Sequence, residues 1–267
     1  MAEVAGIYRR LLAARIRADW QYRTSFVLFA LAQGLITLLD FLVIAVLFDQ
    51  VPQLGGWTLS EVAFLYGLAS LAFSLSDVFI SQVENVATLI REGSFDRLLI
   101  RPLGPLVQIS AEFFALRRLG RVLQSVAVLT LAISWLEVEW DLGRAALTVV
   151  AIASGAVIFG ALFVLTSSIA FWVVGSLEVA NAFTYGGQLL AQYPLSILGE
   201  WLRRFVIYVL PLGFVAYLPA VLILGKPGSA DVPRWLGYAS PVAAALLAVA
   251  ARAVWWTAIR HYRSTGS

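Results

Sequence analysis

Two aspartates stand inside apolar segments of this chain and are its first candidates for chemistry. Asp40 lies within the apolar run 26–48, and Asp77 lies within the run 62–83. A carboxylate in hydrocarbon costs about 2.5–3.5 kcal/mol, so each must face a protein interior, pair with a cation or carry a proton. Two interpretations stay open for both residues: a group on the path of a solute or a proton, or a structural group in an interhelical hydrogen bond or in a pair with an arginine of a partner.

A polar interruption after the second apolar run carries the other candidates. Gly93 is a natural end for one helix, and Ser94 or Asp96 is expected to cap the next, a short helix at 95–100. Pro102 disfavours its continuation. Such a short helix can be held by a partner and move as a rigid body, whereas the alternative is an ordinary basic loop that only sets topology. Three arginines flank it: Arg91, Arg97 and Arg101.

The composition places the chain in a membrane and excludes several classes of site. Hydrophobic residues make up 61% of its 267 residues, above the roughly 45–50% of soluble domains. There is no Cys and one His, His261, which excludes Cys-ligated zinc, haem-thiolate and thiol catalysis and leaves an intramembrane enzyme without a supporting motif. No basic patch alternates with aromatic residues, so no nucleic-acid partner is expected.

No phosphate-binding loop is present. Its closing glycine and lysine would be Gly225 and Lys226, but Ala220 stands where the first glycine is required. ATP and Mg²⁺ are therefore expected on a separate chain, and no cofactor is expected on this one.

The apolar segments predict an all-α integral membrane fold. An amphipathic interfacial helix is expected at 1–25, a transmembrane domain at 26–259 and a cytosolic tail at 260–267. The expected spans are 26–48, 62–83, 122–136, 145–174, one from the region 176–224, and 235–259. Small residues on the fourth span, among them Gly155, permit close helix approach. Trp255 and Trp256 are typical of an interfacial aromatic belt.

The arginines predict the orientation. Five precede the first span, six lie in the loop 86–121, and two lie in the tail, whereas the loops 49–61 and 137–144 are acidic. The positive-inside rule then places both termini and the loop 86–121 in the cytosol. Two cytosolic termini require an even number of spans, and six fits.

The region 176–224 supplies one crossing if the total is six. In one arrangement 180–198 crosses and 205–224 forms a broken, re-entrant pair of half-helices on the outer side. In the other, 205–224 crosses alone, and Arg203 and Arg204 are cytosolic. We favour the first, because the proline and glycine breaks of 205–224 suit helices that are buried in protein or line a cavity.

The polar interruption resembles a known signature. Ile90, Gly93, Asp96, Leu99 and the pair Arg101-Pro102 stand at the spacing that follows the second span in a family of bacterial type-2 ABC-transporter permeases. The order of motifs is similar over nearly the whole chain. The further matching segments are Tyr193-Pro194, Val209-Leu210-Pro211-Leu212, Tyr217-Leu218-Pro219-Ala220 and the tail 262–267.

The resemblance implies a six-span permease with a cytosolic coupling helix and a re-entrant gate region at 200–224. The residues expected to couple to the ATPase are Arg91, Gly93, Phe95, Asp96, Arg97, Leu98, Leu99, Arg101 and Pro102. The residues expected at the gate or on the translocation path are Asp40, Asp77, Gln188, Gln192, Pro194, Pro211, Tyr217 and Pro219.

The expected function is that of the membrane subunit of an ATP-driven exporter in the bacterial inner membrane. Its expected partners are an ABC ATPase, a second permease that is identical or homologous, and membrane lipid, and its expected substrate is amphipathic or lipid-like. The alternative is a stand-alone secondary transporter or channel that uses Asp40 or Asp77. It predicts ion-driven flux without ATP.

Overall fold

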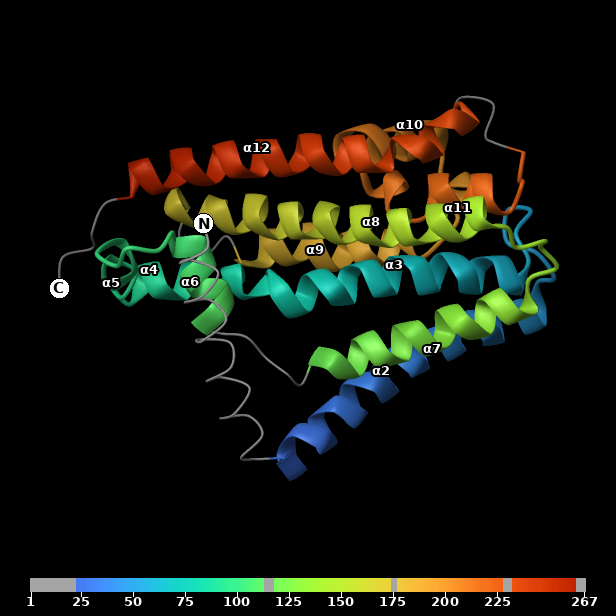
Figure 1. Ribbon diagram of the computed structural model, residues 1–267, viewed down its shortest axis with the longest axis horizontal. Helices are drawn as coiled ribbons and strands as arrows, with labels where there is room; N and C mark the ends of the chain where they lie inside the picture. Colours follow the sequence, from blue (N-terminus) through green and yellow to red (C-terminus); the bar gives the residue numbers. More distant parts are fainter. Residues whose placement is uncertain (1–22, 113–117, 174–176, 228–231, 263–267) are drawn as a thin grey trace.

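All regular elements in the described part of the chain are helical (Figure 1). The computed structural model describes residues 23–112, 118–173, 177–227 and 232–262. The long helices are α2 (Arg23–Gln50), α3 (Leu59–Phe79), α7 (Leu119–Trp135), α8 (Leu142–Ser168), α9 (Leu177–Ala191) and α12 (Ser240–His261). The short helices are η1 (Ser81–Asn85), α4 (Val86–Arg91), α5 (Asp96–Leu99), α6 (Pro105–Glu112), η3 (Ile169–Phe171), η4 (Leu195–Ile197), α10 (Glu200–Arg204), the π-helical η5 (Phe205–Val209), η6 (Leu212–Phe214), α11 (Tyr217–Ile223) and η7 (Arg234–Ala239).

Three described helices are long and apolar enough to cross a membrane: Leu59–Phe79, Leu142–Phe171 and Arg234–His261. A fourth crossing would combine Glu200–Val209 with Leu212–Ile223, which are bent by 77° at their junction. The other expected spans correspond to α2, to α7 and to α9, and six crossings stay a prediction. The amphipathic helix expected at 1–25 lies almost wholly outside the described residues, as does most of the tail.

Helix α3 forms the centre of the bundle. Its most apolar window is 89% buried, whereas that of α12 is 22% buried. Helices α7 and α8 approach α3 closely, because glycine stands at both contacts. A Cβ on Gly67 would lie 2.8 Å from Leu129 Cα of α7, and one on Gly155 would lie 2.8 Å from Ala72 Cβ of α3. The predicted role of Gly155 in close helix approach is thus confirmed.

The bundle has two distinct ends (Figure 1). We call the end that carries α4, α5 and α6 the loop end, and the opposite end the far end. Helices α3 and α8 begin at the far end, each with a carboxylate at its first turn. Glu61 Oε2 accepts from the backbone N of Thr58 at 2.8 Å, and Asp141 Oδ1 accepts from the backbone N of Arg144 at 2.7 Å. Acidic groups at helix N-termini satisfy otherwise unpaired backbone donors.

Candidate functional site

The turn between α4 and α5 depends on Gly93. Its φ of 65° is left-handed, a conformation that glycine adopts without steric cost. The Gly93 backbone N donates to the Ile90 carbonyl at 3.1 Å, and the Ser94 backbone N donates to the Leu89 carbonyl at 2.9 Å. These bonds close the end of α4. Gly93 therefore ends the helix as the sequence predicts.

The predicted cap of the next helix is wrong. Helix α5 spans Asp96–Leu99, shorter than the expected 95–100, and its N-cap residue is Phe95, with no side-chain cap bond. The hydroxyl of Ser94 instead donates backwards to the Leu89 carbonyl at 3.3 Å. Tertiary packing of Phe95 fixes this turn in place of a polar cap.

The inner face of α5 is anchored by an aromatic cluster, which we define as Phe95, Phe171, Trp255 and Tyr262. The Phe95 side chain is fully buried. Its ring centroid lies 5.2 Å from that of Phe171, at the end of η3, and 5.0 Å from that of Tyr262, just after α12. Phe171 in turn lies 5.6 Å from Trp255 of α12. The cluster joins α5 to the loop-end termini of α8 and α12, two of the spans.

A glutamine holds α5 against α6. Gln108 Nε2 donates to the Leu98 carbonyl at 2.8 Å and to the Leu103 carbonyl at 2.6 Å. Gln108 is buried, as is Leu98. Two backbone carbonyls on both sides of the Arg101-Pro102 stop are therefore fixed by one side chain.

The outer face of α5 is exposed and mixes apolar with basic side chains. Ile100 is 85% exposed, and Leu99 beside it is also exposed. Arg91, Arg97, Arg101 and Pro102 are exposed around them. We call Arg97, Leu99, Ile100 and Arg101 the docking face. An exposed apolar group with a charged rim is typical of a protein-binding surface.

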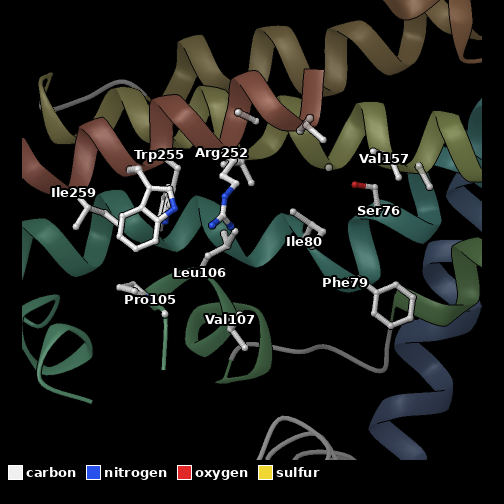
Figure 2. Close-up of a pocket in the computed structure, with 18 of the residues that line it drawn as sticks. Ser76, Phe79, Ile80, Pro105, Leu106, Val107, Val157, Arg252, Trp255 and Ile259 are labelled. Carbon is white, nitrogen blue, oxygen red and sulfur yellow. The ribbon is translucent and has the colours of Figure 1, made fainter. Parts of the chain in front are cut away.

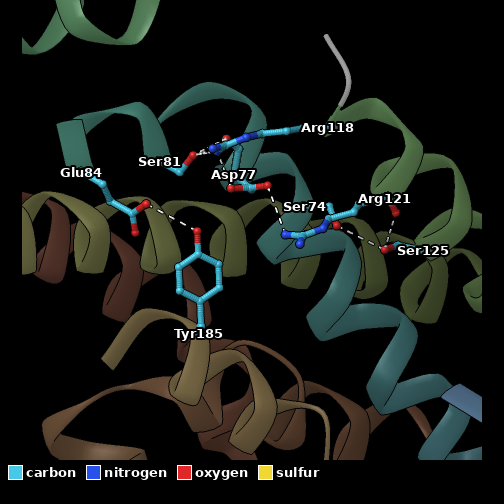
Figure 3. Close-up of polar contacts among 8 residues, drawn as sticks. All are labelled: Ser74, Asp77, Ser81, Glu84, Arg118, Arg121, Ser125 and Tyr185. Carbon is cyan, nitrogen blue, oxygen red and sulfur yellow. Dashed lines mark hydrogen bonds and ion pairs between the residues drawn. The ribbon is translucent and has the colours of Figure 1, made fainter. Parts of the chain in front are cut away.

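Asp77 pairs with two arginines of its own chain at the loop end (Figure 3). Arg118 Nη1 lies 2.5 Å from Asp77 Oδ1, and Arg121 Nη1 lies 3.5 Å from Oδ2. Arg118 also donates to the Asp77 carbonyl at 2.9 Å and to the hydroxyl of Ser81. The carboxylate is almost wholly buried, so these contacts compensate a charge that would otherwise be costly. Asp77 is therefore in an interhelical ion pair, and its arginines belong to its own chain rather than to a partner.

Glu84 lies beside this pair and carries a different kind of carboxyl group (Figure 3). Tyr185 OH of α9 donates to Glu84 Oε2 at 3.4 Å. Among the described residues Glu84 Oε1 has no hydrogen-bond partner. Burial raises the pKa of Glu84 to about 7, with Asp77 raising it further and Arg118 and Tyr185 opposing the shift. Glu84 therefore holds its proton to a higher pH than an exposed glutamate does. We call Asp77, Ser81, Glu84, Arg118, Arg121 and Tyr185 the Asp77 cluster.

The expected gate region begins and ends at the far end. The hydroxyl of Ser196 donates to the Gly55 carbonyl at 3.4 Å, and Lys226 Nζ lies 2.7 Å from Glu61 Oε2. We call the residues between, 197–225, the bent segment. Pro194, Pro211, Tyr217 and Pro219 are all buried within or beside it, and the Tyr217 ring centroid lies 5.8 Å from that of Trp57.

Two expected path residues line a cavity between α2 and α9. Gln188 and Gln192 share it with Ile44, and its volume is about 370 Å³. Gln192 Nε2 donates to the hydroxyl of Ser70 on α3 at 3.0 Å. Asp40 belongs to α2, one turn before Ile44, and nothing further is described of its side chain. The structure brings the two glutamines together, and Tyr185 of the Asp77 cluster lines the same cavity.

Three features are not anticipated from the sequence. Arg118 and Arg121 count there only toward orientation, and nothing in their spacing indicates that they pair with Asp77. Glu84 carries no motif. Arg252 is an exposed basic residue within the last apolar helix. No group of three His, Cys, Asp or Glu side chains that would suit a metal ion occurs in the ranges described.

The family follows from a comparison that covers most of the chain. The model of the family described as ABC-2 family transporter protein matches residues 35–266. Neither any curated protein nor any solved structure shows significant similarity to the chain. Members of this family are multi-pass membrane components that lack ATPase domains and work with partner ATPase subunits. With its helical bundle of apolar spans and its loop signature at the loop end, the chain belongs to the ABC-2 family of transporter membrane proteins.

Proposed function

We propose that this chain is the permease subunit of an ATP-driven exporter of the bacterial inner membrane, and that the docking face is where its ATPase binds. The observation that carries the proposal is the division of α5 into two faces. Phe95 and Leu98 are buried against the bundle, whereas Ile100 is 85% exposed between arginines. One face packs against the spans, whereas the other is accessible to a partner protein.

Movement of the docking face would be transmitted to the bundle through packed side chains. Phe95 contacts the ends of α8 and α12 through the aromatic cluster, and rings in such contact move together because packed interiors deform little. The Asp77 cluster ties α3 to α7 at the same end. Closure of two ATPase subunits would therefore displace four helices as linked bodies, with the bent segment at the far end as the part that opens.

The orientation follows from this proposal. An ATPase in the cytosol requires the loop end to face the cytosol, which agrees with the arginine distribution. Both termini are then cytosolic and the bent segment is a re-entrant gate on the outer side. Its contacts with Gly55 and Glu61 at either end support a path that enters and leaves on one side.

The complex would contain a second permease, identical or homologous, and a substrate of amphipathic or lipid-like character. The cavity beside Gln188 and Gln192 is a candidate stretch of the path between the two permeases. The stand-alone carrier loses support, because Asp77 is held by Arg118 and Arg121 rather than open to an ion.

The test is capture of the ATPase by the tagged chain expressed with its chromosomal neighbours. We expect an ATPase bearing a phosphate-binding loop to co-purify with the wild type in mild detergent. Ile100→Asp places a charge in the apolar centre of the docking face and should reduce the captured ATPase at least about tenfold, a loss of about 1.4 kcal/mol. Arg97→Glu should act in the same direction.

The matched control is Ile197→Asp, a similar change at an exposed position on the far end. It should capture as much ATPase as the wild type. If Ile100→Asp captured as much ATPase as the wild type, the docking face would not be the ATPase-binding site. Recovery of the chain alone, with ion-driven flux in liposomes, would favour the stand-alone carrier over the exporter.

Topology has its own test, because the chain contains no Cys. Single cysteines at Trp201 and at Arg97, both exposed, should be labelled by an impermeant reagent from opposite sides of the membrane. Labelling of both from the same side would contradict the re-entrant arrangement.

A further inference from the structure

A cavity of about 610 Å³ lies near the loop end between α3, α8 and α12 (Figure 2). Phe79 and Ile80 line it from the end of α3, Val157 lines it from α8, and Trp255 lines it from α12. The first residues of α6, with Leu106 among them, border it from the loop. Its walls are almost wholly apolar, so it suits a hydrocarbon chain.

Two polar side chains, Ser76 and Arg252, lie in the otherwise apolar lining of the cavity. The hydroxyl of Ser76 is buried and has no hydrogen-bond partner in the part of the chain that the structure describes. Arg252 reaches from α12 toward Leu106 (Figure 2), and its guanidinium lies 5.9 Å from the Trp256 ring centroid. No carboxylate of the described residues pairs with Arg252. Among the described residues, the Arg252 guanidinium and the Ser76 hydroxyl are therefore two polar groups without a polar partner that line the same apolar cavity.

The depth of Arg252 points to the headgroup level of the bilayer. The helical stretch Arg234–His261 has 28 residues, whereas about 20 cross a hydrocarbon core of about 30 Å. Tyr262 follows it and contacts Phe95 of the polar loop, and we therefore assign the surplus turns to the loop end. This places Arg252 and the two tryptophans beside it near the boundary, where Trp side chains concentrate.

We propose that this cavity holds one anionic phospholipid of the leaflet at the loop end. The phosphate pairs with Arg252, one acyl chain lies along Phe79 and Val157, and Ser76 donates to an ester oxygen. A free phosphate would leave the apolar walls empty, and a neutral lipid would leave Arg252 without a counter-charge. The leaflet is the cytosolic one under the orientation proposed above; the binding itself needs only a membrane.

The experiment measures lipid retention by native mass spectrometry on the purified permease, together with its ATPase where that co-purifies and alone where it does not. The protein is stripped of lipid and supplied with phosphatidylglycerol or phosphatidylcholine of identical acyl chains. We expect one phosphatidylglycerol per permease chain and much lower retention of phosphatidylcholine. Arg252→Gln should lower phosphatidylglycerol retention about fivefold, the factor expected for one basic residue at an anionic surface, and Arg252→Lys should keep most of it.

Two further variants separate the site from general surface charge. Arg260→Gln removes an exposed arginine two turns further along α12 and should leave retention unchanged. Ala156→Phe places a ring in the cavity that this residue lines and should abolish retention of both lipids. Thermal unfolding of each variant shows that it is folded. Arg252 is exposed and pairs with no carboxylate in the ranges described, so its replacement should not unfold the chain.

Three results would overturn the proposal. They are equal retention of the two lipids, unchanged retention in Arg252→Gln, and a disulfide between two copies carrying Val249→Cys, one turn before Arg252. The last would show that a second permease covers this face instead of a lipid. Each leaves the capture of the ATPase by the docking face untouched, so the two proposals fail separately.

Discussion

The two ends of the bundle are held in different ways. At the loop end a buried carboxylate is paired with two guanidinium groups, and the aromatic cluster fixes α5 to α8 and α12. At the far end short helices meet at an angle of 77°, and Lys226, directly after the bent segment, forms an ion pair with Glu61 of α3 in which both side chains are partly exposed. Rigid contacts suit the end that receives a force, and broken helices suit the end that rearranges.

The energetic difference between the ends rests on the carboxylates, because Asp77 is 2% exposed and Glu61 is 16% exposed, whereas the cations at both ends are similarly exposed. Removing one partner of a buried ion pair costs about 3–5 kcal/mol, because the other charge stays buried without compensation. Pairs that keep contact with water contribute about 0–1 kcal/mol. The comparison therefore predicts an order of effects, which single substitutions can sharpen or break.

The largest effect is expected for Asp77→Asn. It leaves Arg118 and Arg121 facing a neutral amide and should lower the free energy of unfolding by about 4 kcal/mol, measured in detergent by denaturant or thermal unfolding. The double variant with Arg118→Gln should recover part of the loss. The control is Glu200→Gln, whose partner Arg204 lies 2.5 Å away on the exposed surface, and it should change stability by less than about 0.5 kcal/mol. Equal losses in Asp77→Asn and the control would deny that the loop end is held by a buried charge.

The next effect is expected for Phe95→Ala. It removes a fully buried ring from the aromatic cluster and should cost about 3 kcal/mol. ATP hydrolysis by the bound ATPase should then proceed without transport, because α5 no longer moves with α8 and α12. Leu99→Ala, an exposed neighbour, should cost less than about 0.5 kcal/mol. Retained stability and coupling in Phe95→Ala would show that α5 transmits force by another route.

Local sequence patterns predict the turn at Gly93 in the loop end, but they do not predict features that depend on residues distant in the sequence. The turn at Gly93 needs a left-handed residue, and the sequence supplies glycine there. The start of α5 is misassigned, since a buried ring replaces the polar cap that Ser94 or Asp96 would provide. The arginines that pair with Asp77 stand 41 and 44 residues away, and a single sequence contains no signal for which cation reaches a given acid.

In the bent segment the sequence predicts the break in the helix but not how the two halves are placed. Its prolines predict the break between η5 and α11, which the bend of 77° confirms. Whether such a pair crosses or returns depends on its packing against Gly55 in the loop before α3 and against Glu61 in the first turn of α3. That packing follows from tertiary contacts that local periodicity does not encode. For the same reason the cavity beside Arg252 is not predicted, because it needs four separate elements.

A smaller effect should appear in the pH dependence of the loop end. Glu84 has a model-compound pKa of 4.5 and a folded-state pKa of about 7, so between these values the folded chain binds more protons than the unfolded chain. The stability that the protonated Glu84 contributes is complete below pH 4.5 and is lost as the pH rises to about 7. Glu84→Gln keeps the neutral form, so its midpoint of thermal unfolding should fall less than that of the wild type from pH 5 to 7. Parallel profiles for the two proteins would place Glu84 in contact with water.

The smallest effect is expected for Lys226→Met at the far end. The change keeps the aliphatic stem over Trp57 but removes the ion pair with Glu61 and the hydrogen bond to the Gly56 carbonyl. Because these groups retain some exposure, the loss should be about 1 kcal/mol or less. Transport should stay equal or rise, since the bent segment is released from α3 without disturbing the loop end. A loss as large as that of Asp77→Asn would mean that the far end is held as firmly as the loop end, and the bent segment would then be a structural cap rather than a gate.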